Sequence, residues 1–199
     1  MFDDVIAKDI SAFHEKCVYT PDWSKSSPLQ FTEGLWKFIE LNHRFNNLLW
    51  DEEDLARRKS VPDSEIAANK RAIDGYNQKR NDAIENIDDL LLQRLAHVKH
   101  EATAWLNSET AGSIIDRLSI VSLKIFHMGL QTQRDDVAQT HIDTCQQKLN
   151  RLTEQRSDLQ YCLDTLLTAA SHGRAYFKIY RQFKMYNDPT LNPYLYQTK

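Results

Sequence analysis

The apolar side chains of this chain recur every three or four positions, the spacing that places them on one face of an α-helix. Near the beginning, the pattern is carried by Phe2, Ile6, Ile10, Phe13 and Cys17. Equivalent patterns follow along most of the remaining sequence. They predict helices over residues 2–17, 28–58, 64–106, 111–129, 135–170 and 174–186. The predicted fold is therefore an all-α bundle of five or six helices with long central helices, in a single domain over residues 1–199.

Proline and capping residues mark the boundaries of these helices. The segment 27–30, Ser-Pro-Leu-Gln, combines an N-cap, a proline suited to the first helical position and a capping-box glutamine, and Thr32 is the alternative cap. The segment 60–63, Ser-Val-Pro-Asp, separates two long helices. Because this turn is short, the helices over 28–58 and 64–106 are expected to form an antiparallel hairpin. Asn107 to Thr110 supplies a turn and a cap for the next helix.

Two predicted helices have apolar surfaces that indicate how they pack. The helix over 111–129 is apolar around most of its circumference, so it is expected to be the most buried element. The helix over 135–170 carries a heptad-like apolar stripe that includes Arg156, which suits packing against a neighbouring helix. The same stripe predicts, as an alternative, a homodimer through this helix. Residues 1–26 are expected to hold a helix and a proline-containing loop, and residues 187–199 an irregular tail.

Composition and charge exclude several classes of protein. Five glycines and five prolines in 199 residues are too few for the turns of a many-stranded sheet. A formal net charge of -3 does not favour nucleic-acid binding or an anionic membrane surface. The first residues are acidic and no apolar run approaches the roughly 18 residues of a bilayer span, so we expect a cytoplasmic protein. Three widely spaced cysteines predict neither disulfides nor a cysteine metal site.

The helix over 28–58 carries polar and aromatic side chains opposite its apolar face. One stripe contains Trp36, Glu40, His43, Asn47, Trp50 and Asp54, flanked by Asn46, Glu53 and Arg57. Two tryptophans on one face indicate burial or a ligand, because a solvated face rarely carries such large rings. The stripe is thus interpreted either as part of a binding site or as a buried polar network that holds the helix in register.

A second polar stripe lies on the helix over 64–106. It consists of Asp74, Asn77, Asn81, Glu85 and Asp88. In the expected hairpin it faces the first stripe, and gathered carboxylates repel one another unless a cation lies between them. The positive charge would come either from Mg²⁺ or Mn²⁺ bound by oxygen ligands or from structural ion pairs with Arg57, Lys70 and Arg80. A plain solvated face is the other interpretation.

The helix over 111–129 contributes charged residues that need partners if the helix is buried. We therefore expect one polar centre shared by the helices over 28–58, 64–106 and 111–129. The candidate acid or base groups are His43, Glu85 and His127. The candidate ligand-binding residues are Asn46, Trp50, Arg57, Asn77, Asn81, Arg117 and Lys124. The candidate metal ligands are Glu53, Asp54, Asp74 and Asp88.

Two known motifs match these stripes only loosely. Glu40-x-x-His43 has the spacing of di-iron bundles, but those sites need a second Glu-x-x-His together with two further glutamates, and only one copy of the motif occurs in the chain. Asp51-x-x-Asp54 and Glu85-x-x-Asp88 resemble the paired acidic motifs of all-α nucleoside triphosphate pyrophosphatases, in which carboxylates hold Mg²⁺. The separation between the two pairs is longer than that class usually has.

The segment over 174–186 shows the strongest charge asymmetry of the chain. Basic residues alternate with aromatic ones, and no acidic residue occurs between Thr165 and Asn187. The basic members are Arg174, Lys178, Arg181 and Lys184. Such a segment can hold phosphate groups or stack on a base, or it can be a solvated basic face above an aromatic packing contact.

Four long blocks of the sequence resemble a bacterial family known as domain-of-unknown-function 4254. They span residues 42–58, 70–88, 108–128 and 181–196, for example NHRFNNLLWDEEDLARR in the first. The resemblance implies a mostly helical, cytoplasmic protein, and its association with genes for surface polysaccharide assembly implies a sugar or nucleotide-sugar ligand. Ala111 stands where the family leads us to expect a proline, which affects only the start of one helix.

These observations lead to two hypotheses about function. The first is binding of a small phosphorylated or sugar-containing ligand between the helices over 28–58, 64–106 and 111–129, with or without a divalent cation and catalysis. The second is a non-catalytic helical interaction module that self-associates through the helix over 135–170. Under the second hypothesis, the polar stripes serve only to hold helices together.

Overall fold

The computed structural model describes residues 2–181, 185 and 188–196, and these residues form a mostly helical protein. The long helices are α3 (Gly34–Leu55), α4 (Asp63–Leu95), α5 (Ala111–Thr132) and α6 (Gln139–Ser171). Shorter elements are α1 (Ala7–Val18), α2 (Trp23–Ser26), α7 (Pro193–Tyr196) and the strands β1 (Trp105–Leu106) and β2 (Ala175–Tyr176). The predicted all-α bundle is confirmed, with one very short parallel strand pair added to it.

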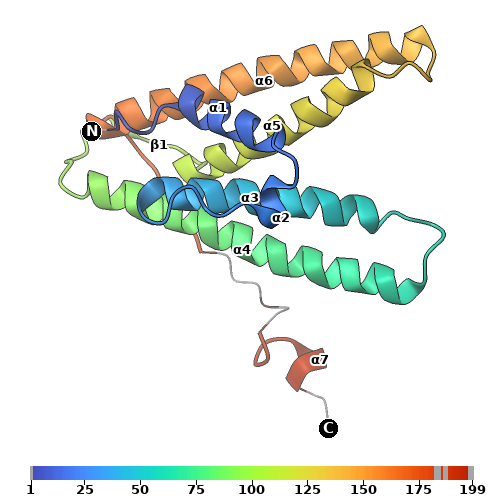
Figure 1. Ribbon diagram of the computed structural model, residues 1–199. Coiled ribbons are helices and arrows are strands. Elements are labelled where there is room, and N and C mark those ends of the chain that lie inside the picture. Colours follow the sequence, from blue (N-terminus) through green and yellow to red (C-terminus); the bar gives the residue numbers. More distant parts are fainter. Residues whose placement is uncertain (1, 182–184, 186–187, 197–199) are drawn as a thin grey trace.

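Two antiparallel helical hairpins form the body of the molecule (Figure 1). One hairpin consists of α3 and α4, as expected from the short proline-containing turn, and the other consists of α5 and α6. They pack together at one end, where α1 also contacts α5 and α6. Toward their loops the two hairpins diverge, so the molecule has the outline of a V (Figure 1).

The hydrophobic core fills the closed end of the V, with α5 at its centre. This helix contacts α1, α3, α4 and α6, which agrees with its apolar circumference. The core includes the fully buried Ile39, Ile87, Leu118 and Leu163, one from each long helix. Burying each such side chain contributes about 1.5–3 kcal/mol to the free energy of unfolding.

The structure corrects the predicted start of the helix over 28–58. The helix begins at Gly34, because residues 30 and 31 are held in a non-helical segment by the buried carboxylate of Glu40. That carboxylate accepts the backbone N–H groups of Gln30 and Phe31 at 2.9–3.0 Å. Ser27 and Pro28 therefore lie outside α3, despite their suitability as a cap.

The structure also corrects two predicted helices near the closed end. The helix over 64–106 ends at Leu95, and the chain then passes through a loop to β1. Gly173, with a φ of 73°, ends α6 and turns the chain so that β2 runs parallel to β1. The amide of Trp105 donates to the carbonyl of Arg174 at 3.1 Å. These long-range hydrogen bonds exclude the predicted helix over 174–186 in its described part, while Lys184 lies outside the described residues.

The apolar stripe of α6 is partly used within the chain. Leu159, Leu163 and Leu166 are buried in the body of the protein. Arg156 lies 3.6 Å from the carboxylate of Glu15 on α1, so it is paired without a second copy. Homodimer formation through α6 stays a prediction. Within the described residues, no helix is both long enough and apolar enough to span a bilayer.

The close approach of α4 and α5 depends on Gly112. A Cβ atom there would lie 2.7 Å from the carbonyl oxygen of Ile84 and 2.8 Å from a carboxylate oxygen of Asp88. We expect Gly112→Ala to lower the free energy of unfolding by about 1–3 kcal/mol, because the helices must separate. Gly129→Ala on the same helix has open space and should raise it by up to about 1 kcal/mol. Urea unfolding of both variants tests this, and equal effects would contradict the packing described.

Candidate functional site

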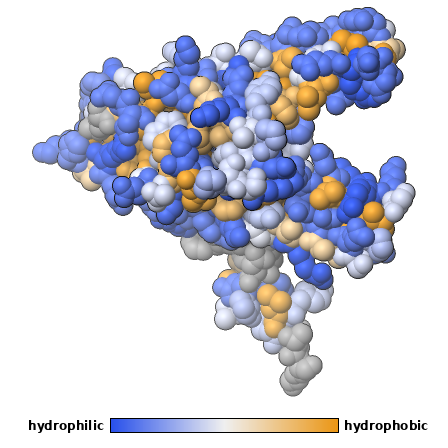
Figure 2. All heavy atoms as spheres, in the orientation of Figure 1, coloured by the Kyte–Doolittle hydropathy of each residue, from blue (hydrophilic) through white to orange (hydrophobic). Residues whose placement is uncertain are grey.

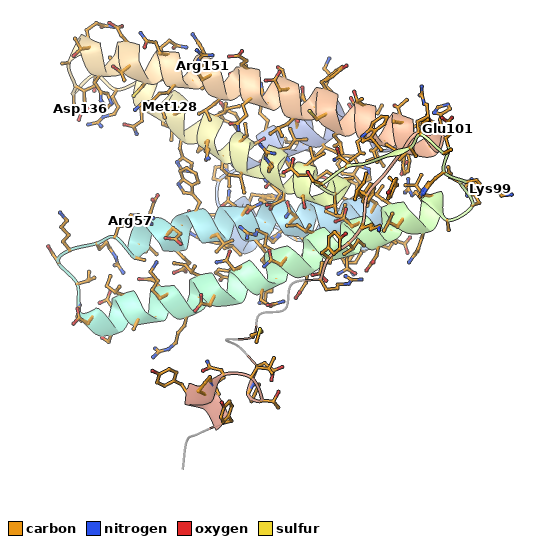
Figure 3. The ribbon with its side chains drawn as sticks, turned by 180° about the vertical axis from the view of Figure 1, so that it is seen from behind. Arg57, Lys99, Glu101, Met128, Asp136 and Arg151 are labelled. Carbon is orange, nitrogen blue, oxygen red and sulfur yellow. The ribbon has the colours of Figure 1, made fainter. Side chains whose placement is uncertain are left out.

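The opening between the two hairpins forms a cavity of about 1180 Å³. Figure 2 shows it as a notch between the two arms of the molecule. In Figure 3, Arg57 marks the arm that contains α3, and Met128 and Arg151 mark the arm formed by α5 and α6. Side chains of α3, α5 and α6 line this cavity, which we call the cleft. They include Trp50, Asp54, Lys124, His127, Lys148, Arg151 and Gln155.

A stacked pair of aromatic rings joins the two hairpins in the cleft. The rings of Trp50 on α3 and His127 on α5 are nearly parallel, at 6°, with their centroids 4.3 Å apart. Burial lowers the pKa of His127, and the carboxylates of Asp54 and Asp51 oppose this shift. The imidazole is therefore neutral at pH 7 and able to accept a proton. Trp50 Nε1 is buried and has no hydrogen-bond partner among the described residues.

A second cavity of about 440 Å³ adjoins the cleft between α3, α4 and α5, and we call it the inner cavity. Trp50 and Asp54 line both spaces. The other lining residues are Asn46, Leu49, Glu53, Arg57, Asn77, Arg80, Ile120 and Leu123. The inner cavity thus combines two arginines, two carboxylates and two amides with an apolar wall.

Eight of the fourteen residues predicted for the site line these two adjoining spaces. They are Asn46, Trp50, Glu53, Asp54, Arg57, Asn77, Lys124 and His127. The structure therefore brings together residues from all three helices that were expected to share a polar centre.

Three other predicted residues, Asn81, Glu85 and Asp88, lie at a separate cavity of only about 100 Å³. Glu85 forms an ion pair with Arg181 at 2.6 Å, so this carboxylate anchors the C-terminal segment to α4. Asp88 accepts the amide N–H of Gly112 at 2.6 Å at the start of α5. Burial raises the pKa of Asp88 to about 6, although its hydrogen bonds oppose that shift.

Asp74 and Arg117 were predicted to reach the site, but the structure places both elsewhere. The side chain of Asp74 is exposed, and it lines neither the cleft nor the inner cavity. Arg117 is exposed and pairs with Glu109 at 2.7 Å. Helical spacing placed Asp74 in the polar stripe of its helix and Arg117 on the charged side of the next helix, but both side chains are exposed away from the cleft.

The four candidate metal ligands do not converge. Glu53 and Asp54 lie near the end of α3, Asp74 is exposed on α4, and Asp88 binds the start of α5. Among the residues that the structure describes, no three His, Cys, Asp or Glu side chains are grouped to hold a metal ion. This geometry does not support the expected Mg²⁺ or Mn²⁺ site. It also does not support metal binding by the paired acidic motifs, because Asp51 of the first pair forms an ion pair with Lys25 at 2.7 Å.

His43 belongs to a buried polar network and lines neither the cleft nor the inner cavity. Its Nε2 donates to the backbone carbonyl of His14 at 3.1 Å, which leaves Nδ1 to accept the hydroxyl of Ser119 at 2.8 Å. Burial lowers the pKa of His43 to about 3. Asn46 extends the network by donating to Asp116 at 2.8 Å and to Ser119 at 2.9 Å. For His43, the alternative of a register-holding network describes the structure better than catalysis.

Glu40 is likewise occupied. Its buried carboxylate accepts two backbone N–H groups and lies 3.4 Å from Arg44, so the Glu40-x-x-His43 spacing does not present ligands to a metal. Trp36, on the same stripe, packs against Phe13 and Phe31 and donates to the carbonyl of Asp4 at 3.0 Å. Of the two tryptophans, only Trp50 lines the cleft.

Sequence analysis did not assign several lining residues to ligand binding. Arg80 appeared only as a counter-ion, although it lies one helical turn from Asn77 on the same face. Lys148, Arg151 and Gln155 of α6 were missed because no motif marks them. Their position in the cleft follows from the packing of α6 on α5, which the local sequence pattern does not define.

The sequence pattern of one protein family, described as "Protein of unknown function (DUF4254)", matches residues 36–179. This range contains α4, α5 and α6 entirely and α3 from its third residue onward. It also contains every residue of the cleft named above. No curated protein and no solved structure matches the chain.

The buried histidine pair predicts acid sensitivity. His14 stacks on His43 at 4.3 Å, and neither of its ring nitrogens has a partner among the described residues. Burial lowers the pKa of His14 well below its usual value of about 6.5. Both rings are thus neutral in the folded state, and their contribution to stability is complete above about pH 6.5 and declines as the pH falls toward 3.

At pH 7 we expect the free energy of unfolding of His14→Phe to stay within about 1–3 kcal/mol of the native value, because the larger phenyl ring must fit a fully buried position while two unpaired nitrogens are removed. When the pH falls from 6.5 to 5, the free energy of unfolding should decrease by about 1–2 kcal/mol less in the variant than in the native chain. Asp88 titrates with the opposite sign in the same range, but its effect cancels in the comparison. Urea titrations across this range measure the slopes. The exposed His97→Gln should keep the native slope, and an unchanged slope in His14→Phe would contradict the assignment.

Proposed function

We propose that this chain, which belongs to the DUF4254 family, binds a small phosphorylated or sugar-containing ligand in the cleft between its two hairpins. The observation that carries the proposal is the Trp50–His127 stack, which places an aromatic surface inside a large open cavity. Aromatic faces bind sugar rings and bases, and ligand sites commonly combine such faces with a few polar groups. The cleft and the inner cavity are large enough for a ligand of this kind.

Charge supports an anionic ligand. The cleft and inner cavity together hold five lysine or arginine side chains and three carboxylates, in a chain whose formal net charge is -3. Two of the carboxylates are paired, since Glu53 lies 2.8 Å from Arg57 and Glu154 lies 3.1 Å from Arg151. Lys124 and Lys148 have no carboxylate partner among the described residues. Anionic groups of the ligand would therefore meet ammonium and guanidinium groups, without need of a divalent cation.

The remaining groups suit hydroxyl-rich ligands. Asp54 is exposed at the junction of the two spaces, and its carboxylate can accept hydrogen bonds from hydroxyl groups. Asn77 and Gln155 each supply both a donor and an acceptor. His127 adds a neutral imidazole beside this surface, able to accept a proton from a bound hydroxyl group.

Thermal unfolding with a panel of sugar phosphates and nucleotide sugars tests the proposal. A ligand at 100 times its Kd adds about 2.7 kcal/mol, which raises the Tm by at least about 5 °C for a chain of this length. The double variant Lys124→Gln/Lys148→Gln should lose most of the shift. These lysines are exposed, so the variant should melt near the native Tm without ligand.

The matched control is Lys8→Gln/Lys16→Gln, which removes the same charge from exposed positions on α1. It should retain the full shift. Absence of a shift with every compound, combined with a Tm that rises with protein concentration, would instead support the self-associating interaction module.

A further inference from the structure

We infer that the inner cavity is an oxyanion subsite, which holds the phosphate group of the ligand through Arg80 and Trp50. This inference rests on the proposed function and adds to it the place and chemistry of one part of the ligand. Arg80 is its principal cation, although no stripe or motif of the sequence singles this residue out for binding.

The first observation is a pair of unsatisfied donors in one space. Trp50 Nε1 and Arg80 Nε are both buried without a hydrogen-bond partner in the described parts of the chain, and both side chains line the inner cavity. Each unpaired buried N–H costs about 1–3 kcal/mol. A group with several acceptor oxygens can satisfy both donors. An oxyanion such as phosphate, bound between the two side chains, would accept from both and gain charge-assisted hydrogen bonds.

The second observation is that Arg80 lacks a counter-ion. Among the described residues no carboxylate pairs with it, and its hydrogen bond to the Asn81 side chain is long, at 3.4 Å. Arg57 on the opposite wall differs, because it pairs with Glu53. The planar guanidinium of Arg80 carries five N–H donors that match two oxygens of a phosphate group.

The surroundings of Arg80 favour an anion over bulk water. The apolar wall of Leu49, Ile120 and Leu123 lowers the local dielectric constant, which strengthens the attraction between a guanidinium and an oxyanion. Glu53, which lines the same cavity, already faces both Arg57 at 2.8 Å and Lys70 at 3.6 Å. Asp54 lies at the mouth, where solvent screens its charge.

The two spaces together define an orientation for the ligand. Trp50 lines both the cleft and the inner cavity, and its ring stacks on His127. A sugar or base in the cleft would therefore extend its phosphate past the edge of Trp50 toward Arg80. The geometry points to phosphate monoesters and nucleotide sugars as ligands, in preference to neutral sugars.

Isothermal titration with glucose 1-phosphate, glucose and inorganic phosphate tests this inference in the full chain. We expect Arg80→Gln to weaken glucose 1-phosphate and inorganic phosphate at least tenfold and to leave the affinity for glucose unchanged. The matched control is Arg71→Gln, which removes the same charge from an exposed position on α4 and should bind all three compounds like the native chain.

A second variant protects the test against a folding defect. Trp50→Phe keeps an aromatic ring against His127 but removes the Nε1 donor, and it should weaken glucose 1-phosphate several-fold with little effect on glucose. Native affinity for phosphate compounds in both variants would overturn the subsite and leave the cleft proposal intact. If the native chain bound glucose but neither glucose 1-phosphate nor inorganic phosphate, the subsite would likewise be overturned and the cleft proposal would stand. Absence of binding by sugar phosphates, nucleotide sugars and neutral sugars alike would overturn both proposals.

Discussion

The hydrogen bonds between α3 and α5 determine where every other part of this molecule can lie. His43 and Asn46 on α3 both reach Ser119 on α5, and Asn46 also reaches Asp116. His43, Asn46 and Ser119 are buried, so a shift of one helix along the other would leave several polar atoms without partners at a cost of about 1–3 kcal/mol each. The network therefore fixes the relative position of the two helices along their axes.

The stacked pair in the cleft follows from that register. Trp50 lies seven residues after His43, and His127 lies eight residues after Ser119. At 1.5 Å per residue both steps cover about 10–12 Å in the same direction, because α3 and α5 run parallel where they meet. The rings are thereby brought face to face at 4.3 Å. The buried network, whose Asn46 also lines the inner cavity, positions the surface that we propose for binding.

The open cleft is a consequence of where the hairpins are joined. At one end, Gly112 allows α5 to approach α4 closely, and the core helices and α1 close around them. Beyond the Trp50–His127 pair, each hairpin continues with its own partner helix, and the two diverge (Figure 1). Polar and charged residues of α3, α5 and α6 can therefore face a common space without being buried in a core.

The sequence by itself determined the helices, the hairpin of α3 and α4, the central place of α5 and eight of the residues that line the cleft and the inner cavity, because helical periodicity defines which side chains share a face. It could not define the angle between the hairpins. Helix packing leaves Asp74, Asp88 and Arg117 outside the cleft, brings Lys148 to the cleft and places Arg80 at the inner cavity. Tertiary contacts also decided where helices begin and end. Glu40 holds residues 30 and 31 outside α3. The β1–β2 pair takes the place of the end of the helix predicted over 64–106 and the start of the helix predicted over 174–186. Local propensity is weaker than a satisfied buried carboxylate or a set of long-range backbone hydrogen bonds, and only the folded chain shows where those form.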